Sequence, residues 1–197
     1  MWPRPASCRA AERKREAARQ DISDTALRLF IEHGYEATTI DQIAARVGLS
    51  ARSVFRHFTT KEDIVLAQLN RSGERLHDAL RLRPPAEPAW DALRQAFDVL
   101  LADHAESPDR LRRIITMVQE SPLLHARHLE QQPRWQEPLV PLIAARLGVP
   151  DGHPSPRALV AAAFTCLDVA VSTWAAHDDG TTIGEVLDTI IATVRGT

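Results

Sequence analysis

The polar side chains best placed to do chemistry lie in a short segment that begins at Ser50. Within it, Ala51, Val54 and Phe58 recur at spacings of three and four residues and would share one face of a helix. The residues that project elsewhere can donate hydrogen bonds, and they are Arg52, Ser53, Arg56 and His57. A short helix with such a polar side suits the DNA major groove, which is about 12 Å wide. The predicted chemistry is hydrogen bonding to base edges and phosphates.

Another short helix is predicted just before this segment. Its apolar residues recur at helical spacing, and they are Ile40, Ile43, Ala44 and Val47. Thr39 and Gln42 form a capping-box pattern at its start, and Gly48 ends it where a left-handed residue is favoured. Leu49 is expected to turn inward and fix the corner. The two helices and their tight turn predict a helix-turn-helix.

A further cap follows at Thr60, with Asp63 three residues later. It predicts the start of a longer helix. Lys61 falls in the first turn of that helix, where its amine would lie near DNA phosphates.

Three runs of residues carry a resemblance to a known family. They extend from Ala26 to Thr39, from Ile43 to Ser50 and from Phe55 to Glu62. In residue types and spacing they resemble the N-terminal domain of TetR-family transcriptional regulators, and the resemblance covers about the first third of the chain. It implies a homodimer of all-helical subunits whose second and third helices bind double-stranded operator DNA. It also implies a C-terminal domain that binds a small-molecule effector, which usually releases the DNA.

The resemblance assigns roles to individual residues. It implies that Thr39 caps the second helix and touches phosphate, and that His57 and Lys61 bind phosphate. Phe55 stands where many members have a tyrosine that donates to phosphate, so that contact is absent here. The residues implied to face bases are Ala51, Arg52 and Ser53. The complete set of candidate DNA-binding residues is Thr39, Ser50, Ala51, Arg52, Ser53, Phe55, Arg56, His57 and Lys61.

Composition is that of an ordinary globular protein, with 197 residues, 44% hydrophobic and 25% charged. Aromatic residues are few, and prolines lie mostly between stretches of helical periodicity, so we predict an all-α fold of about nine to ten helices. The net charge of −2 is not typical of a DNA-binding protein. The distribution of charge favours DNA binding by the N-terminal part of the chain. Residues 1–70 hold 11 basic and 9 acidic side chains, whereas residues 71–197 hold 13 basic and 17 acidic ones.

The predicted organisation is a three-helix head on a larger helical body. Residues 1–10 are expected to form a flexible arm, 11–60 the DNA-binding domain, and 61–197 the effector-binding and dimerisation domain. Basic residues up to Arg15 could follow a phosphate backbone or remain a solvated helix start. A connecting helix is predicted over 61–83, ended by the proline-rich segment that follows. Gly73 inside it could mark a mechanical link or permit close packing.

Proline positions organise the body. Ser107, Ser121 and Ser155 each precede a proline and predict helix starts. Further prolines predict a short helix to about Gln131 and a kinked one ending at Leu147. Bowed helices could enclose an apolar effector site, for which ordinary core packing is the alternative. Its candidate residues are Phe97, Leu101, His104, Met117, Val118, Trp135, Leu139, Phe164 and Leu167. The effector would be a lipophilic or acyl-chain molecule, with a polar head near His104 or arginine side chains.

The last two predicted helices have wide apolar faces, the second starting at a capping box formed by Thr182 and Glu185. Doubled by symmetry, they would make a four-helix dimer interface. The candidate interface residues are Leu159, Ala163, Ala170, Trp174, Ile183, Val186, Leu187, Ile190 and Ile191. The alternative is that these helices only close the core of their own subunit.

Other function classes are disfavoured by what the sequence lacks. The apolar span from Ala158 to Ala176 carries Asp168 at its middle, where a charge costs about 3 kcal/mol, so no membrane role is predicted. Cys8 and Cys166 form no disulfide framework or zinc pattern, and no signal peptide is evident, which fits the cytoplasm.

Enzyme motifs are also missing: the sequence has no glycine-rich phosphate loop, no nucleophile elbow and no zinc-protease motif. His125 and His128 share a predicted helix face without a suitably spaced carboxylate, so neither a metal nor a cofactor is expected. The predicted function is a ligand-responsive transcriptional regulator, most simply a repressor, that binds a palindromic operator as a homodimer and is released by a largely apolar effector. The alternatives are a DNA-binding protein with no effector and, more remotely, a small helical enzyme.

Overall fold

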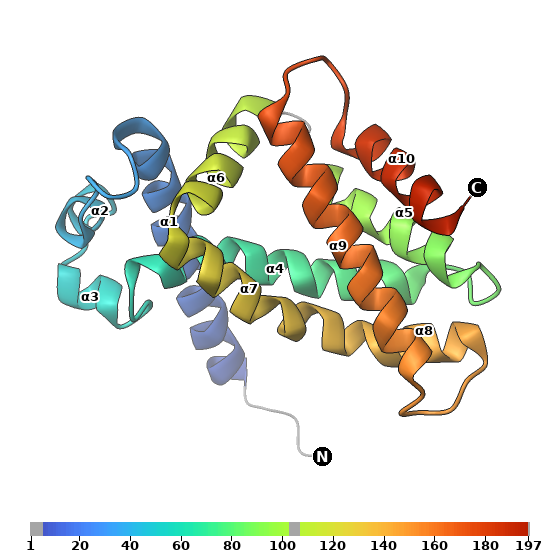
Figure 1. Cartoon of the computed structure of the whole chain (residues 1–197). Helices are drawn as coiled ribbons and strands as arrows, with labels where there is room; N and C mark the ends of the chain where they lie inside the picture. The colour runs from blue at the N-terminus through green and yellow to red at the C-terminus, as the bar shows by residue number, and fades with distance from the viewer. Residues whose placement is uncertain (1–5, 103–106, 197) are drawn as a thin grey trace. The chain divides into compact units, whose positions relative to one another are not determined.

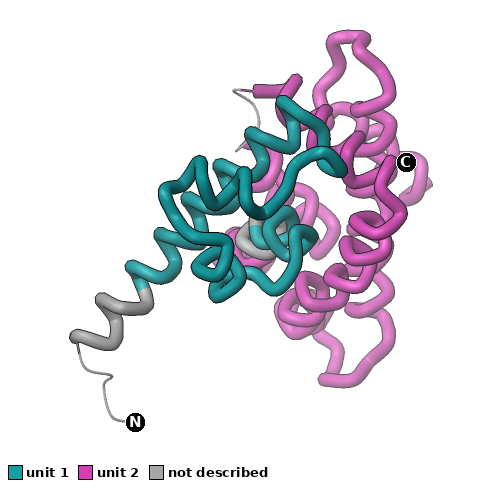
Figure 2. Tube along the Cα trace, turned by 90° about the vertical axis from the view of Figure 1, so that its left-hand side faces the viewer, with its two compact units in different colours: residues 1–69 teal, residues 70–197 magenta. Residues whose placement is uncertain are grey.

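The computed structural model describes residues 6–102 and 107–196, apart from the side chains of 6–12 and 68–72. Over these residues the chain forms ten α-helices, one short 3-10 helix and no strand (Figure 1). The predicted all-α class is confirmed. The chain divides into two compact units, residues 1–69 and 70–197 (Figure 2).

Unit 1 contains α1 (Ala6–His33), α2 (Ile40–Arg46), α3 (Ala51–Phe55) and the first part of α4 (Lys61–Leu82). Its core is made of the apolar faces of these four helices, and the buried residues are Ile22, Ala26, Leu27, Leu29, Phe30, Tyr35, Ile43, Ala44, Val54, Phe58, Ile64, Val65 and Leu66. The buried Ser23 hydroxyl donates to the Ile64 carbonyl at 2.8 Å and ties α1 to α4. The division between the units therefore falls inside α4, later than the expected boundary at residue 60.

The first helix starts earlier than the sequence predicted. Its backbone is helical from Ala6, five residues before the expected start at Ala11. The expected arm of residues 1–10 thus includes helical residues 6–10, while 1–5 lie outside the described residues. The helix ends as predicted before Gly34, whose φ of +89° is accessible to glycine at little cost.

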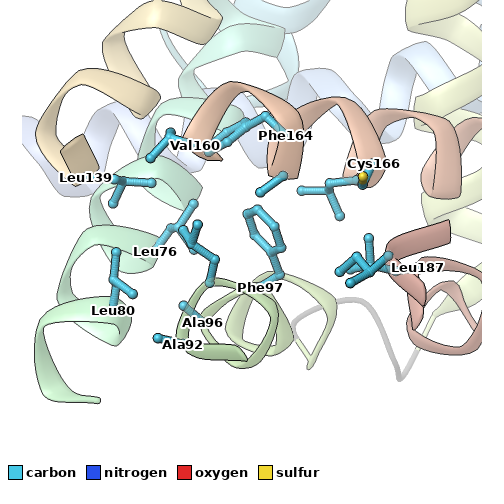
Figure 3. Close-up of a cluster of buried hydrophobic side chains, with 14 of the residues drawn as sticks. Leu76, Leu80, Ala92, Ala96, Phe97, Leu139, Val160, Phe164, Cys166 and Leu187 are labelled. Atoms are coloured by element: carbon cyan, nitrogen blue, oxygen red, sulfur yellow. The ribbon is translucent and has the colours of Figure 1, made fainter. Parts of the chain in front are cut away.

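Unit 2 contains the rest of α4 and the helices of the body. These are α5 (Ala89–Ala102), α6 (Pro108–Glu120), α7 (Pro122–Gln136), the 3-10 helix η1 (Glu137–Leu139), α8 (Val140–Leu147), α9 (Pro154–Ala176) and α10 (Ile183–Arg195). Phe97 on α5 points toward α9, where its ring meets that of Phe164 edge-on with the centroids 5.5 Å apart (Figure 3). The centre of the body is therefore a filled apolar core shared by α4, α5, α8, α9 and α10.

Two predicted helix boundaries in the body are wrong. The helix expected to end near Gln131 continues through Pro133 to Gln136, and the 3-10 helix η1 then joins it to α8. The helix expected to start at Ser155 begins at Pro154, because the His153 side chain accepts the Ser155 backbone N–H at 3.3 Å. Ser107 makes no side-chain cap, although α6 starts at the expected proline.

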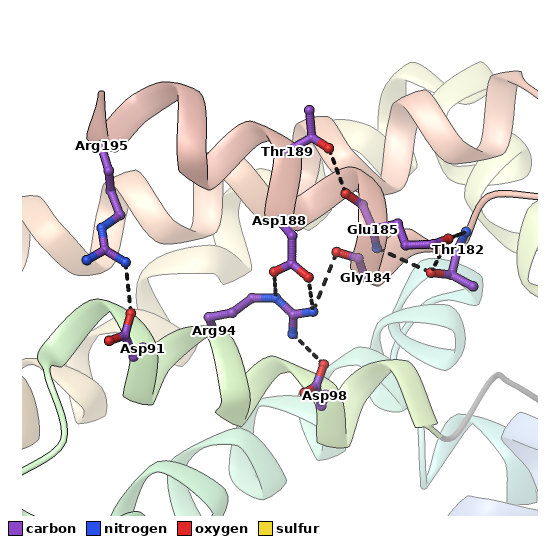
Figure 4. A network of polar contacts seen from close by, with 9 residues as sticks. All are labelled: Asp91, Arg94, Asp98, Thr182, Gly184, Glu185, Asp188, Thr189 and Arg195. Atoms are coloured by element: carbon purple, nitrogen blue, oxygen red, sulfur yellow. Dashed lines mark hydrogen bonds and ion pairs between the residues drawn. The ribbon is translucent and has the colours of Figure 1, made fainter. Parts of the chain in front are cut away.

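Polar contacts fasten α10 to α5 (Figure 4). The Arg94 guanidinium on α5 binds both carboxylate oxygens of Asp188, at 2.5 and 3.1 Å, and also pairs with Asp98. The hydrogen bond to Asp188 contributes most to a raised Arg94 pKa. Nearer the end of α10, Arg195 donates to Asp91 of α5 at 2.8 Å. The last helix is thus held by a bidentate charge pair as well as by apolar packing.

The long apolar helix α9 meets the length and composition needed to cross a membrane. Its inner face, however, is part of the body core, with Val160, Ala163, Cys166 and Ala170 among its buried residues. A helix of this composition is expected when one face packs against several neighbours in a helical body. We interpret α9 as a core helix.

Candidate nucleic-acid interface

The turn between α2 and α3 is fixed by local hydrogen bonds. Thr39 and Gln42 form the predicted capping box, with the Gln42 side chain accepting the Thr39 N–H at 2.8 Å. At the other end of α2, Gly48 has φ +70°, and the Leu49 N–H donates to the Ala44 carbonyl at 2.9 Å. This is a Schellman ending, which a left-handed glycine permits. The Leu49 side chain did not turn inward as expected, since 39% of it is exposed.

The outer face of α3 is polar and internally linked. Ser50 caps the helix by accepting the Ser53 N–H at 3.2 Å, and the two hydroxyls are 3.0 Å apart. Arg56 donates to the Ser53 hydroxyl at 3.3 Å. Arg52 is exposed, while Val54 is fully buried on the opposite face. The hydrogen-bonding residues of α3 therefore face solvent together, as an element that enters a groove requires.

The apolar residues on this surface differ in accessibility. Ala51 is half-buried, whereas Phe55 is 53% exposed. The Phe55 ring has no donor for a phosphate, so it can offer only apolar contact. Thr39 is exposed at the start of α2.

Basic side chains from α1 and from Arg56, the residue after α3, surround His57. An open hollow of about 430 Å³ is lined by Arg15, Arg56 and His57. Arg19 donates to the His57 carbonyl, and its guanidinium lies 4.3 Å from the centre of the Phe58 ring. Within the described part of the chain, no carboxylate pairs with Arg15 or Arg56 through a salt bridge. We call Arg15, Arg19, Arg56 and His57 the basic cluster.

The surroundings of His57 disfavour its protonated form. Burial lowers the pKa of His57, and the charges of Arg15, Arg19 and Arg56 lower it further. Its Nδ1 atom is buried and has no hydrogen-bond partner among the described residues. An anion placed in the hollow would offset the repulsion from the arginines.

Lys61 has a different environment from the one expected. Its amine donates to the Tyr35 carbonyl at 2.7 Å and to the Thr38 carbonyl at 3.2 Å, and it lies 4.1 Å from the centre of the Tyr35 ring. Tyr35 in turn donates to Glu62 at 2.5 Å, and burial followed by this bond raises the Tyr35 pKa far above its usual range. The amine of Lys61 thus links the loop before α2 to the start of α4. Because the residue is half-buried, only part of its side chain is accessible to a phosphate.

Sequence reasoning missed one member of the basic cluster. Arg19 was not a candidate, and Arg15 was assigned equally to a phosphate contact or to a solvated helix start. The available signal was their spacing of four residues, which places both on one side of α1. What the sequence does not show is that this side packs beside the end of α3.

The candidate effector residues occupy three different environments. Phe97, Leu139, Phe164 and Leu167 are buried in the body core, and Leu101 and Trp135 pack against it. Met117 and Val118 are half-buried on α6, a helix that buries none of its side chains fully. His104 lies outside the described residues.

Most candidate dimer residues face inward. The buried ones belong to the core of their own subunit, and they are Ala163, Ala170, Trp174, Ile183, Leu187 and Ile191. Leu159, Val186 and Ile190 are partly buried beside it. The expectation that the six buried residues face a second subunit is therefore wrong, because α9 and α10 use these side chains against each other and against α5. The outer faces of the same helices expose Val169 by 47% and Val194 by 57%.

The described residues bring together no group of three or more histidine, cysteine, aspartate or glutamate side chains that could hold a metal ion.

Comparison with known proteins identifies both parts of the chain. Residues 22–67 match the family model described as bacterial regulatory proteins of the tetR family, and residues 87–197 match the one described as the MftR C-terminal domain. The chain is 34% identical over 157 residues to the HTH-type transcriptional regulator TcmR of Streptomyces glaucescens, covering 76% of this chain and 70% of that protein. It is 29% identical over 182 residues to the HTH-type transcriptional repressor AcnR of Corynebacterium diphtheriae, covering 90% and 91%.

A solved structure shows the same fold. The TetR-family repressor FadR of Thermus thermophilus, in complex with lauroyl-CoA, matches with a TM-score of 0.59 and 23% identity, covering 90% of this chain and 93% of that one. One family model spans the helix-turn-helix and the other spans more than half of the chain, so this protein belongs to the TetR family of transcriptional regulators.

Proposed function

We propose that the protein is a ligand-responsive repressor that binds a palindromic operator as a homodimer and leaves it when a largely apolar effector binds the body. The observation that carries this proposal is the exposed polar face of α3 beside the basic cluster. Arg52 and Ser53 supply donors for base edges, while Arg15, Arg56 and His57 supply contacts for the phosphate backbone. The name of the relative AcnR, a repressor, supports the negative sign of regulation.

Two reading helices need a fixed separation, which a symmetric dimer provides. The outer faces of α9 and α10 support this role, because Val169 on α9 and Val194 on α10 are exposed. Ile190 and Val186, one and two turns before Val194 on α10, are partly buried. These four side chains, which we call the outer stripe, replace the buried residues as the proposed interface. The half-sites would then lie about one helical turn apart, roughly 34 Å.

The proposed effector site is in the body, along α6 and α7. Apolar side chains of α6 that reach only half burial could complete their burial against a ligand, and Met117 and Val118 are among them. The fold neighbour FadR is seen with lauroyl-CoA, which supports an acyl-chain ligand. A ligand that favours one spacing of the two reading helices must change DNA affinity, and DNA must change ligand affinity by the same factor.

The direct test has two steps. Duplexes selected by the protein from a randomised library should contain inverted repeats, and mobility shifts should separate the selected duplex from a scrambled one. Lauroyl-CoA or laurate should then raise the melting temperature and weaken the shift with the selected duplex. Absence of any selected sequence would overturn the operator proposal. Selection without a response to any apolar ligand would instead support a DNA-binding protein with no effector.

A further inference from the structure

The body contains a polar cluster beside its apolar core. Asp168, near the middle of α9, accepts a hydrogen bond from the Gln132 amide of α7 at 2.5 Å. The Nε2 atom of His128, also on α7, lies 3.9 Å from the other carboxylate oxygen. The neighbour of Asp168 in sequence, Leu167, is buried in the core. A carboxylate has therefore been placed where apolar body and polar surface meet.

Two buried atoms of this cluster lack hydrogen-bond partners among the described residues. They are His128 Nδ1 and Gln131 Oε1. When Nε2, which faces the Asp168 carboxylate, carries the ring proton, Nδ1 is an acceptor. The amide oxygen is an acceptor as well. A buried acceptor without a donor is unfavourable, and such atoms often mark a site where a ligand or an ion supplies the missing hydrogen bond.

An aromatic side chain extends the cluster by another turn. Trp135 lies on the same side of α7, two turns after His128 and one turn after Gln131. Its ring is 5.4 Å from that of His128, centroid to centroid. The side chains of His128 and Asp168 are 21% and 43% exposed, so the cluster is accessible from solvent. We call His128, Gln131, Gln132, Trp135 and Asp168 the Asp168 cluster.

The chemistry of the Asp168 cluster is selective. It combines one carboxylate, two unpaired acceptors and an aromatic ring, all of which favour a hydrogen-bond donor with positive charge. A carboxylate or phosphate head group would meet the charge of Asp168 and find no donor at the unpaired atoms.

We propose that the Asp168 cluster binds the ammonium head group of an amphiphilic effector whose apolar part lies against α6 and α7. The proposal rests on the proposed function, because it names the ligand class of the same regulatory body. It adds to that function that the head group of the effector is a cationic hydrogen-bond donor and not an anion.

The experiment compares amphiphiles that share a twelve-carbon chain. Dodecylamine, dodecanol, laurate and lauroyl-CoA are each titrated below their aggregation concentrations, with binding measured calorimetrically and by displacement of the selected duplex. Dodecylamine is expected to bind at least about tenfold more tightly than laurate, with dodecanol between them. Dodecyltrimethylammonium separates charge from hydrogen bonding, and it should bind less tightly than dodecylamine because it has no N–H donor.

Two variants locate the site. Asp168→Asn keeps the size of the side chain and an acceptor for Gln132, and it should weaken dodecylamine binding about tenfold while changing dodecanol binding less than about twofold. Gln131→Leu, which removes one unpaired acceptor, should weaken dodecylamine binding without unfolding the protein. The matched control is Asp151→Asn, which removes a carboxylate from an exposed loop and should change neither affinity.

The outcomes distinguish this inference from the proposed function. Equal or tighter binding of laurate or lauroyl-CoA, or an unchanged dodecylamine affinity in Asp168→Asn, would overturn the inference and leave an effector-controlled repressor intact. If none of the amphiphiles binds or displaces DNA, the effector part of the proposed function fails with it.

Discussion

Trp135 on α7 packs directly against Gly73 on α4. A Cβ atom added to Gly73 would lie 2.3 Å from Trp135 Cδ1 and 2.8 Å from Cγ, distances that no stable contact allows. Helix α4 continues through this position without a break, up to Leu82. Of the two explanations offered for Gly73, close packing accounts for the glycine by itself.

We predict that Gly73→Ala lowers the free energy of unfolding by about 1–3 kcal/mol, because an indole ring and a helix backbone must separate. The sign is informative, since alanine in an open helix position would stabilise by about 1 kcal/mol. Urea unfolding followed by circular dichroism measures the change. In a Trp135→Leu background the same substitution should become neutral or stabilising, and an unchanged penalty there would show that the indole is not the cause.

Base recognition is predicted to depend on Arg52. Its side chain is exposed on α3 and pairs with no described carboxylate through a salt bridge, so Arg52→Ala should leave stability unchanged and relax the preference for one base pair by about 1–3 kcal/mol. Mobility shifts with single-base variants of the selected duplex measure the preference. Uniform weakening across all of these duplexes would contradict a base contact.

Lys61 is predicted to matter for both stability and affinity. Lys61→Met removes the charged donor from the Tyr35 and Thr38 carbonyls and should lower the free energy of unfolding by about 1–3 kcal/mol. It should also weaken binding to selected and scrambled duplexes alike and reduce the slope of log affinity against log salt by about one. A normal salt slope together with lost stability would restrict Lys61 to a structural role.

The basic cluster predicts that DNA affinity rises as the pH falls from about 8 to about 6. Burial and then the three arginines lower the His57 pKa in the free protein, whereas a bound phosphate would raise it, so binding takes up a proton. The stability of the DNA-free protein has the opposite pH dependence. The unfolded chain binds a proton at His57 more tightly than the folded chain does. The free energy of unfolding that neutral His57 contributes is therefore present above about pH 6.5 and is lost as the pH falls below that value.

His57→Gln removes the titration, and it should flatten both pH dependences in mobility shifts and urea unfolding. Retention of the full pH dependence of DNA binding in this variant would assign the proton to another group. His33, an exposed histidine in the last turn of α1, offers the control substitution His33→Gln.

Dimerisation is predicted to depend on the outer stripe. Val169→Arg and Val194→Arg place charges on the exposed faces of α9 and α10, and they should shift the protein from dimer to monomer in analytical ultracentrifugation. Leu82→Arg provides the control, because Leu82 is 76% exposed on another helix and should tolerate the charge. A dimer that survives both valine substitutions would place the interface elsewhere.

Much of the fold could be predicted because the signals are local. Thr39, Gly48 and Ser50 act within three to five residues of their partners, so residue type alone fixes the boundaries of α2 and α3. Helical periodicity likewise separates the inner from the outer face of each helix.

The candidate sites were harder to predict from the sequence, because helical periodicity does not show which helix an apolar face packs against. Periodicity predicts that the inner faces of α9 and α10 meet a second subunit, whereas Ala163 of α9 and Leu187 of α10 are buried in the core of their own subunit. Asp168 was noted only as a charge within an apolar span, since the approach of Gln132 from α7 is a tertiary event. The same limit hid Arg19, whose partner His57 lies 38 residues away.

The caps of unit 1 have a kinetic consequence. Thr39 with Gln42, Ser50 with Ser53, and Thr60 with Asp63 each close a hydrogen bond across only three residues. Such bonds can form before distant segments of the chain meet. The helix ends of unit 1 therefore do not wait for long-range contacts to form. A head built this way is expected to refold rapidly after local opening, and association with an operator would then be limited by encounter rather than by reassembly of the head.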